Sequence, residues 1–424
     1  MRNQDYFKGK RIVIVGFARS GLACANLLFD LGARVSITDN KSDDLVFNNK
    51  KKLRSANIKV ELGGHSQDFI KGNDLLVISP GVPNEAMPIS WAKEQGIPVI
   101  SEIELAWVLC PANIIAVTGS NGKTTVTTLI GKILEAAGKK VFVCGNIGRP
   151  FSGEVERMKA DDYVSLEVSS FQLENIRDFK PKVSVLLNFT RNHMDRYTAI
   201  EQYLDAKKRI FINQDASDYA VFNSDDPVLR QAANDSRAKV VLFGKVNGLN
   251  PNHSAVMAVG SILGINEDLC RKVFNDFGGV EHRMEFVAEI NQVKFINDSK
   301  ATTVESAMWA LRSINSPIIL IAGGKDKGLH YEQVLPAARG KVREVILIGE
   351  AREKIKNSLQ NDLSVHEANT LKDAVSLAFC KANPGDSVLL SPMCASFDMF
   401  SDYEQRGRVF KEIVLDLVKN GAKY

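Results

Sequence analysis

Apolar residues along the chain occur in short runs that alternate with stretches in which they recur every three or four positions. Short apolar runs are typical of buried parallel strands, and the wider spacing is typical of helices that cover them. A first series predicts a helix over 21–31 and strands at 11–15, 35–38, 75–79 and 98–100. A second predicts strands from 114 and at 163–168, 183–187, 219–223 and 240–243, and a third, beginning near residue 279, at 294–296, 318–322, 345–348 and 387–390.

Each series carries enough apolar runs for a sheet of its own. We therefore expect an α/β protein with three domains and parallel sheets, since 424 residues with 45% hydrophobic content exceed one ordinary domain. No low-complexity segment or sequence repeat interrupts the pattern.

Composition then excludes several classes of protein. No apolar run has the roughly eighteen residues of a membrane span, and the charged start, Met1 to Lys10, is unlike a signal peptide. The six cysteines lack paired or metal-type spacing and are expected to be small buried residues in a reducing compartment. A net charge of +4 without an aromatic-basic stripe disfavours nucleic acid and suits anionic small substrates. We expect a soluble, cytoplasmic protein.

Residues 114–125 form four apolar positions followed by a glycine-rich turn. Gly119 and Gly122 allow a tight turn that exposes N–H groups, and Lys123 can reach the outer phosphates of a nucleotide. Thr124 supplies a hydroxyl where such loops bind magnesium. The strict pattern has glycine where this chain has Val117, so the loop is a shortened form. The alternative is a sharp corner without a ligand, but helical spacing follows in Val126, Leu129, Ile130, Ile133 and Leu134.

The first domain has a partial dinucleotide fingerprint. Gly16 and Gly21 fit, but Ala18 occupies the position of the middle glycine, which disfavours a nicotinamide site. A nucleotide diphosphate could still lie on the helix that begins near Ser20. A structural domain without a ligand remains the alternative. Ser79 and Gly81 follow a strand, where such sheets bind ligands.

Three further candidates follow predicted strands or lie on a predicted helix of the second series. Glu167 ends a strand and is well placed to hold magnesium, although a solvated strand end is possible. His193 follows the next strand, where a lone histidine is more often structural. Lys207 lies in a charged run, 206–209, that by itself indicates a solvated helix face.

Taken in order, these motifs closely resemble the Mur ligases, ATP-dependent amide-bond-forming enzymes of peptidoglycan precursor synthesis. The motifs are residues 118–124, 145–148, 169–174, 193–197 and 206–207. Two more, residues 297–302 and 390–398, resemble the branch of the family that adds D-glutamate. The resemblance spans the whole chain. It implies a Rossmann-like N-terminal domain over 1–103, a central P-loop-type ATPase domain over 104–281 and a Rossmann-like C-terminal domain over 282–424.

The resemblance also implies the chemistry. The carboxylate of UDP-N-acetylmuramoyl-L-alanine attacks the γ-phosphate of ATP, and D-glutamate then displaces phosphate from the acyl phosphate. Catalytic roles fall on Lys123, Glu167, His193, Lys207 and Lys300, with metal ligands for two Mg²⁺ in Thr124, Glu167, His193 and Lys207. Lys207 would carry a carbamate formed with carbon dioxide, because an ammonium would repel magnesium. Carbamate formation requires a deprotonated amine, so the pKa of Lys207 should be lowered.

Binding roles are implied in the same way. ATP would contact Gly119, Ser120, Asn121, Gly122, Lys123, Thr124, Thr125, the pair His282 and Arg283, Asp298 and Asp326. The UDP substrate would contact Ser20, Asp39, Asn40, Lys41, Ser79, Gly81 and Asn146. D-glutamate would contact Thr302, Lys327, Ser396 and Tyr403. We expect these small molecules as partners of a monomer, with no nucleic acid.

Two departures from the family pattern affect these expectations. The stretch 244–254 is short and lacks the usual adenine-binding motif, so Asn250 or Asn252 is expected to substitute. Tyr403 stands where an aromatic without a hydroxyl is common, which preserves stacking. The competing functions are a related ligase with another amino acid or a folate-type substrate, a nucleotide-binding protein without catalysis, and an oxidoreductase built on the first domain.

Overall fold

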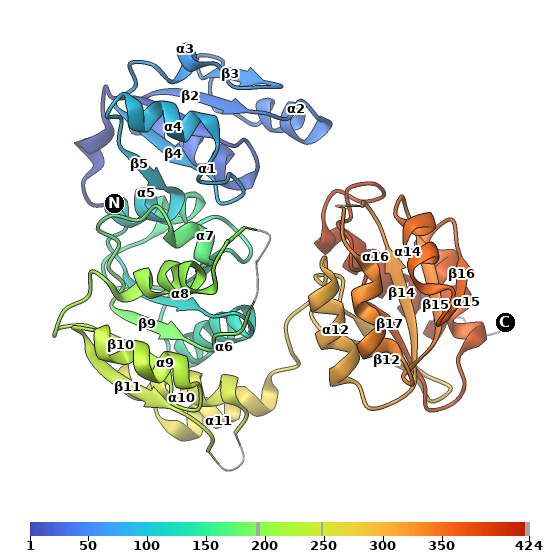
Figure 1. Cartoon of the computed structure of the whole chain (residues 1–424). Helices are drawn as coiled ribbons and strands as arrows, with labels where there is room; N and C mark the ends of the chain where they lie inside the picture. Colours follow the sequence, from blue (N-terminus) through green and yellow to red (C-terminus); the bar gives the residue numbers. More distant parts are fainter. Residues whose placement is uncertain (192–195, 247–248, 327, 420–424) are drawn as a thin grey trace. The chain divides into compact units, whose positions relative to one another are not determined.

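The computed structural model describes residues 1–191, 196–246, 249–326 and 328–419. The chain divides into two compact units, Met1–Phe277 and Gly278–Tyr424, which are described separately (Figure 1). The described residues form three sheets, two in the first unit and one in the second. The predicted α/β class is therefore confirmed.

The first sheet has the order β3-β2-β1-β4-β5 and is parallel throughout. In its central strand β1 (Arg11–Val15), the residues from Ile12 to Val15 are fully buried. A strand covered on both faces is apolar along its length, which explains the pattern in the sequence. The other elements are β2 (Arg34–Asp39), β3 (Lys59–Leu62), β4 (Leu75–Ile78), β5 (Val99–Ser101), α1 (Arg19–Asp30), α2 (Asp44–Lys50), α3 (Gln67–Ile70), α4 (Met87–Glu94) and α5 (Glu102–Leu109).

The second sheet has the order β11-β10-β9-β6-β8-β7 and is also parallel. Helix α6 (Lys123–Ala136) follows β6 (Asn113–Thr118), and the five apolar residues predicted at helical spacing are all buried in it. The remaining strands are β7 (Val141–Gly145), β8 (Tyr163–Glu167), β9 (Val183–Leu186), β10 (Tyr219–Asn223) and β11 (Lys239–Phe243). The remaining helices are α7 (Ser170–Leu173), α8 (Ile200–Lys208), α9 (Pro227–Ala232), α10 (Pro251–Ile262) and α11 (Glu267–Asp276).

The third sheet, in the second unit, has the order β12-β13-β17-β14-β15-β16. Strand β12 is antiparallel to β13, and the other pairs are parallel. Its strands are β12 (Glu285–Ile290), β13 (Val293–Asn297), β14 (Ile318–Gly323), β15 (Val342–Ile348), β16 (Ser364–Glu367) and β17 (Ser387–Leu390). Its helices are α12 (Val304–Ser313), α13 (Leu335–Ala338), α14 (Arg352–Leu359), α15 (Leu371–Lys381) and α16 (Tyr403–Lys419).

Helix α5 joins the first two sheets through two buried carboxyl groups. Glu102 accepts a hydrogen bond from the Ser152 amide at 2.6 Å. Glu104 accepts three, from the amides of residues 177–179, at 2.9, 3.0 and 2.9 Å. Burial raises the pKa of both groups, and the hydrogen bonds oppose that shift. The two sheets of the first unit are thus tied together by polar contacts inside the protein.

Two expectations from composition can be compared with the fold. Five of the six cysteines are buried, as expected, but Cys380 is exposed. Within the described residues, no helix combines the length and the apolar character that a membrane crossing requires.

Candidate functional site

The segment between β6 and α6 is a tight turn that requires glycine at its end. Gly122 caps α6 with φ 82°, a left-handed conformation that side chains rarely adopt. A Cβ added there would also lie 2.6 Å from the side-chain oxygen of Asn252, on α10. The strand, turn and helix expected of a phosphate-binding loop are therefore present, with Asn252 beside the turn.

Asn188, just after β9, holds this loop in place. Its carbonyl oxygen accepts from the Ser120 amide at 3.0 Å, and its Oδ1 accepts from the Asn121 amide at 2.8 Å. The Ser120 hydroxyl donates to the Thr190 carbonyl at 3.1 Å and accepts from the Thr190 amide at 3.0 Å. The segment after β9 thus holds the backbone of the loop, and the start of a helix such as α6 is a usual place for an anion to bind.

Two lysines meet at one carbonyl of the loop. The Lys123 ammonium donates to the carbonyls of Gly119 at 2.8 Å and Ser120 at 3.0 Å. The Lys207 side-chain nitrogen, from α8, donates to the same Gly119 carbonyl at 2.9 Å and lies 4.5 Å from the ring centroid of Tyr203. Lys207 is only 2% exposed, so it does not lie on a solvated helix face. Burial, and then the charge of Lys123, hold its pKa well below the ordinary value.

Glu167 lies beside the start of the loop because β8 is paired with β6 in a register that places it opposite Val117. Its side chain is buried, and its Oε1 accepts from the Asn146 side-chain amide at 2.8 Å. Thr124 is buried in the first turn of α6. Carboxylate and hydroxyl oxygens are the ligands that magnesium prefers. His193 lies outside the described residues, and the described ones hold no cluster of three His, Cys, Asp or Glu side chains.

At the first sheet, the predicted ligand residues stabilise a turn. Asp39 accepts from the Phe17 amide at 2.6 Å and from the Lys41 amide at 2.9 Å. The Ser79 hydroxyl donates to the Gly16 carbonyl at 3.0 Å. The carboxylate of Asp39 thus already organises the backbone of the turn. Ser20, Asn40 and Gly81 follow the ends of β1, β2 and β4.

In the second unit, Asp298 follows β13 and is buried. Burial raises its pKa to about 7, although the Ser391 hydroxyl, at 2.9 Å, and the charge of Arg283 favour the ionised form. The Nε of Arg283 is buried and has no hydrogen-bond partner in the described part of the chain. Non-glycine residues with positive φ flank this region at His282 (63°), Met284 (47°) and Met393 (61°). Such backbone strain is concentrated at functional sites in proteins.

The other predicted residues of this unit follow adjacent strands of the third sheet. The Lys300 ammonium lies 5.7 Å from the ring centroid of Tyr403, the first residue of α16. Asp326 follows β14. Its Oδ2 lies 2.9 Å from Nζ of Lys354 in an ion pair, and its Oδ1 accepts a hydrogen bond from the Tyr331 hydroxyl at 2.9 Å. Thr302 follows β13 and Ser396 follows β17, whereas Lys327 lies outside the described residues.

Sequence reasoning missed Arg406, a buried guanidinium on α16. It donates to the hydroxyl and carbonyl of Ser299 at 3.0 and 2.8 Å, to the Cys394 carbonyl at 3.2 Å from two nitrogens, and to the Ala395 carbonyl at 3.3 Å. These bonds tie the segment after β13 to the segment after β17. An arginine on an amphipathic helix is expected on its exposed face, so the sequence gave no indication that Arg406 is buried.

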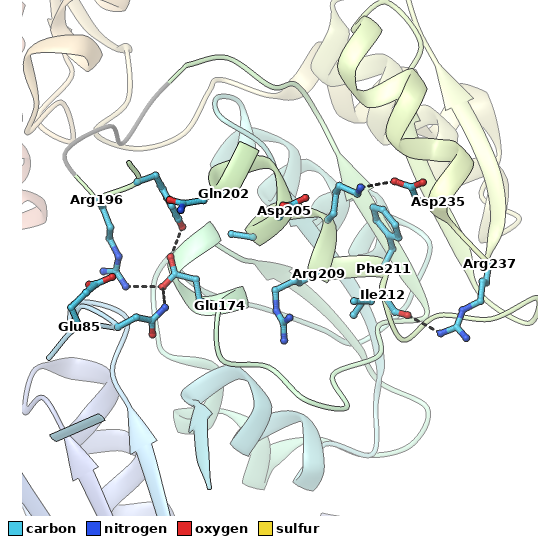
Figure 2. Close-up of a pocket in the computed structure, with 14 residues that line it drawn as sticks. Glu85, Glu174, Arg196, Gln202, Asp205, Arg209, Phe211, Ile212, Asp235 and Arg237 are labelled. Atoms are coloured by element: carbon cyan, nitrogen blue, oxygen red, sulfur yellow. Dashed lines mark hydrogen bonds and ion pairs between the residues drawn. The ribbon is translucent and has the colours of Figure 1, made fainter. Parts of the chain in front are cut away.

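A cavity of about 790 Å³ lies between α8 and the loop after β4, and Figure 2 shows its lining residues. Charged side chains line much of it, and several are paired with one another, as in Lys208 with Asp235 and Arg196 with Glu174. None of the described residues predicted for ATP lines this cavity.

Comparison with known proteins decides the family. Models of the Mur ligase MurD-like N-terminal domain, the Mur ligase middle domain and the Mur ligase glutamate ligase domain match residues 10–101, 117–261 and 282–394. The chain belongs to the Mur ligase family. Two curated Mur ligases similar to it are named UDP-N-acetylmuramoylalanine–D-glutamate ligase. The one from Geotalea uraniireducens is 43% identical, covering 96% of this chain and 98% of its own length, and the one from Thermoanaerobacter sp. 39%, covering 97% and 99%.

Solved Mur ligase structures share the fold at lower identity. The UDP-N-acetylmuramate-alanine ligase MurC of Thermotoga maritima has a TM-score of 0.60 and 18% identity, covering 96% of this chain and 99% of its own. MurF of Acinetobacter baumannii has a TM-score of 0.56 and 13% identity, covering 99% and 93%.

Proposed function

We propose that this Mur ligase adds D-glutamate to UDP-N-acetylmuramoyl-L-alanine, using ATP and an acyl-phosphate intermediate, in peptidoglycan precursor synthesis. The observation that carries the proposal is the similarity, at about 40% identity over nearly the whole chain, to ligases named for that reaction. We place the enzyme in the cytoplasm as a monomer, where its product would serve cell-wall growth, cell shape and cell division.

Three domains would divide the work, at 1–103, 104–281 and 282–424. The first would hold the UDP part on the turn organised by Asp39 and Ser79, with Ser20, Asn40, Lys41 and Gly81 around it. Asn146, bonded to Glu167, would contact the sugar-peptide part. The central domain would hold the phosphates of ATP on Gly119 to Thr125.

The substrate carboxylate would attack the γ-phosphorus of ATP, forming the acyl phosphate and releasing ADP. Lys123 and the amides at the start of α6 would stabilise the charge on the transferring phosphoryl group. Magnesium, when bound, neutralises phosphate and carboxylate charge. Thr124, Glu167, His193 and a carbamate on Lys207 would hold it at two sites.

The carbamate accounts for the burial of Lys207. The lone pair of the neutral amine would form a bond to the carbon of carbon dioxide while one C=O π bond breaks and leaves its electrons on oxygen, and the nitrogen would then pass its proton to water, giving an anionic carbamate. This step requires an unprotonated amine, and the lowered pKa of Lys207 supplies one. The carbamate would also place an anion beside the positive charge of Lys123, where the unmodified side chain is a neutral amine.

In the second step the amine of D-glutamate would attack the acyl carbon and displace phosphate. Thr302, Lys327, Ser396 and Tyr403 would bind the amino acid, with Lys300 nearer the reacting phosphates. Arg283, Asp298 and Asp326 would contact the nucleotide. For the adenine side we favour Asn252 over Asn250, since Asn252 lies against Gly122 whereas the Asn250 side chain caps α10 through the His253 amide at 2.9 Å.

The test is phosphate release from ATP with UDP-N-acetylmuramoyl-L-alanine and a panel of amino acids. We expect release that depends on D-glutamate, with L-glutamate, L-alanine and diamino acids as matched controls. Release that ignores D-glutamate or prefers an L-amino acid would contradict the proposal. Binding of ATP without any release would instead favour the non-catalytic alternative.

A further inference from the structure

A half-buried ion pair of the central region, Arg196 with Glu174, lies against the loop after β4. Nη2 of Arg196 lies 2.9 Å from Oε2 of Glu174, and the two side chains are 15% and 9% exposed. The same guanidinium donates to the carbonyls of Pro80 at 3.4 Å and Val82 at 3.2 Å. Figure 2 shows Arg196 and Glu174 pointing toward each other at one end of the cavity. Arg196 therefore connects a central-domain carboxylate with the loop of the first sheet.

The Glu174 carboxylate accepts two further hydrogen bonds. The Tyr197 hydroxyl donates to its Oε1, and the Asn84 side-chain amide donates to its Oε2 at 2.7 Å. The Asn84 oxygen accepts in turn from the Asn175 side-chain amide at 2.7 Å. Oε2 of this half-buried carboxylate thus has one charged and one neutral donor, and Oε1 has a neutral one, an arrangement that fixes the positions of the three donor side chains. Loop residue 84 is thus fixed by the same carboxylate as Arg196.

The other end of this loop packs against the turn proposed for UDP. The Val82 amide donates to the Ser79 carbonyl at 3.0 Å, and the Ser79 hydroxyl donates to the Gly16 carbonyl at 3.0 Å. A Cβ added at Gly16 would lie 2.8 Å from Ser79 Cβ and 3.0 Å from Val82 Cγ2. The loop therefore lies directly between the Gly16 turn and Arg196, and displacing it would move one wall of the turn.

We propose that Arg196 and Glu174 are positioning residues that fix the UDP-binding turn relative to the phosphate-binding loop. This inference rests on the proposed function, in which one substrate spans both sheets and must bring its carboxylate to the γ-phosphate. Reaction rates depend steeply on such placement, and an error of about 1 Å can cost about a hundredfold. The pair thereby sets the distance between two binding sites and touches neither reacting group.

The rival explanation is that the pair only stabilises the fold. A second ion pair offers a control, because Arg54, between α2 and β3, lies 3.6 Å from Glu156 of the central region, with side chains 54% and 40% exposed. Arg54→Lys keeps the charge at a second link between the same two parts. Neither residue contacts the loop of residues 79–84 among the described bonds.

The experiment compares Arg196→Lys, Glu174→Gln and the milder Asn84→Ala with Arg54→Lys in the full-length enzyme. Calorimetry gives the affinity for UDP alone and for ADP alone, each of which uses one site, and steady-state kinetics gives kcat and KM for the complete substrate. We expect UDP and ADP affinities within about twofold of wild type and kcat lower by about 10- to 100-fold for the first two variants. Asn84→Ala should change kcat less, in the same direction, and Arg54→Lys should leave it unchanged.

Wild-type kcat in both Arg196→Lys and Glu174→Gln would overturn the inference. So would a parallel fall in Tm, UDP affinity and ADP affinity, because that pattern indicates general loss of structure. If either variant fails to fold, the other and Asn84→Ala still decide the question. Wild-type enzyme that releases no phosphate with the UDP substrate and D-glutamate would overturn the proposed function itself, and this inference with it.

Discussion

Among the described residues, each unit buries one lysine or arginine side chain, and the two differ in the hydrogen bonds that they make. Lys207 is 2% exposed and Arg406 is 1% exposed, and neither is paired with a carboxylate among the described residues. Arg406 makes five hydrogen bonds to three residues. Lys207 donates to the Gly119 carbonyl, which also accepts from Lys123.

The difference shows how burial can either preserve or remove a charge. Burial lowers the pKa of Arg406 only to about 10, so its guanidinium stays charged and its bonds stay formed. Burial and the neighbouring Lys123 lower the pKa of Lys207 much further, toward a neutral amine. Arg406 is therefore suited to hold two segments together, whereas Lys207 is suited to react.

Substitution of Lys207 should have the largest effect, and it tests whether the buried amine takes part in the reaction. Lys207→Ala and Lys207→Arg should each lower kcat by about 100- to 1000-fold, the usual cost of losing one preorganised electrostatic group. Added acetate or formate should partly restore Lys207→Ala, because a small carboxylate can replace the carbamate that we propose. Lys207→Arg should not be restored, because a guanidinium occupies the space and cannot be carbamylated. Phosphate release measures both effects.

Lys208→Ala is the matched control, since the neighbouring Lys208 is ion-paired with Asp235 at 2.5 Å and partly exposed. We expect its activity to equal that of the wild type, with and without added carboxylate. Full activity of Lys207→Ala without carboxylate would contradict the role assigned to the buried amine.

Arg406→Met tests the other side of the comparison. Removing the guanidinium takes the Arg406 donors from the carbonyls of Ser299 and Cys394, whereas the Ala395 carbonyl keeps the Lys325 amide at 2.9 Å, so the free energy of unfolding of the second unit should fall by about 3 kcal/mol. Urea unfolding followed by Trp309 fluorescence, in a background without the other two tryptophans, measures it. Arg408→Met on the exposed side of the same helix is the control and should change little. Equal stability of the two variants would contradict the structural role.

Asp298 tests the same effect of burial on an acidic group, because burial raises its pKa. Its pKa is about 7 in the folded state against 3.8 ordinarily, so the folded unit holds the proton more tightly. The associated stability is present at low pH and is lost as pH rises through 7, at about 1.4 kcal/mol per pKa unit. Relative to Asp298→Asn, the wild type should therefore lose a few kcal/mol between pH 5 and pH 8. Parallel pH profiles of the two proteins would contradict this.

Glu102 should give the smallest effect. Burial raises its pKa, and its Oε2 is buried without a hydrogen-bond partner in the described part of the chain. Its ionisation therefore costs stability as pH rises above about 4.5. Glu102→Gln, which can still accept from Ser152, should raise the free energy of unfolding of the first unit by about 1 kcal/mol at pH 8 and by little at pH 4.

Glu104→Gln is the contrasting control for that prediction. Glu104 accepts three amides across two oxygens, and glutamine offers one acceptor. We expect this variant to be less stable than wild type at pH 8. Stabilisation by both substitutions would show that burial alone, without the hydrogen bonds, controls these carboxyl groups.

The strands that the sequence pattern did not reveal are β3, β7, β12 and β16, and each lies at the edge of its sheet. Edge strands are covered less completely, so their sequences tolerate polar residues, as in Lys59–Leu62 and Ser364–Glu367. The central strands are more apolar and more deeply buried, as in Leu75–Ile78 and Ser387–Leu390, and all of them were identified. The antiparallel pairing of β12 with β13 has no counterpart in the pattern of apolar residues.

In the candidate site, too, some residues could be predicted from the sequence and others could not. Glycines, lysines and acids that follow strands could be named from the sequence, because the carboxyl ends of parallel strands share an edge. Asn188, Arg196 and Glu174 carried no role in the sequence, because their partners lie in segments distant along the chain. Arg406 was missed for the same reason.

The sequence by itself determined the α/β class, the family and the glycine-rich turn between β6 and α6. These follow from local periodicity and from short motifs whose residues are neighbours in the chain. Only the tertiary structure decided that Lys207 is a buried amine beside Lys123, and that Arg196 joins Glu174 to the loop of residues 79–84. The reason is physical: burial and charge pairing depend on which distant segments pack together, and the pattern along one segment does not contain that information.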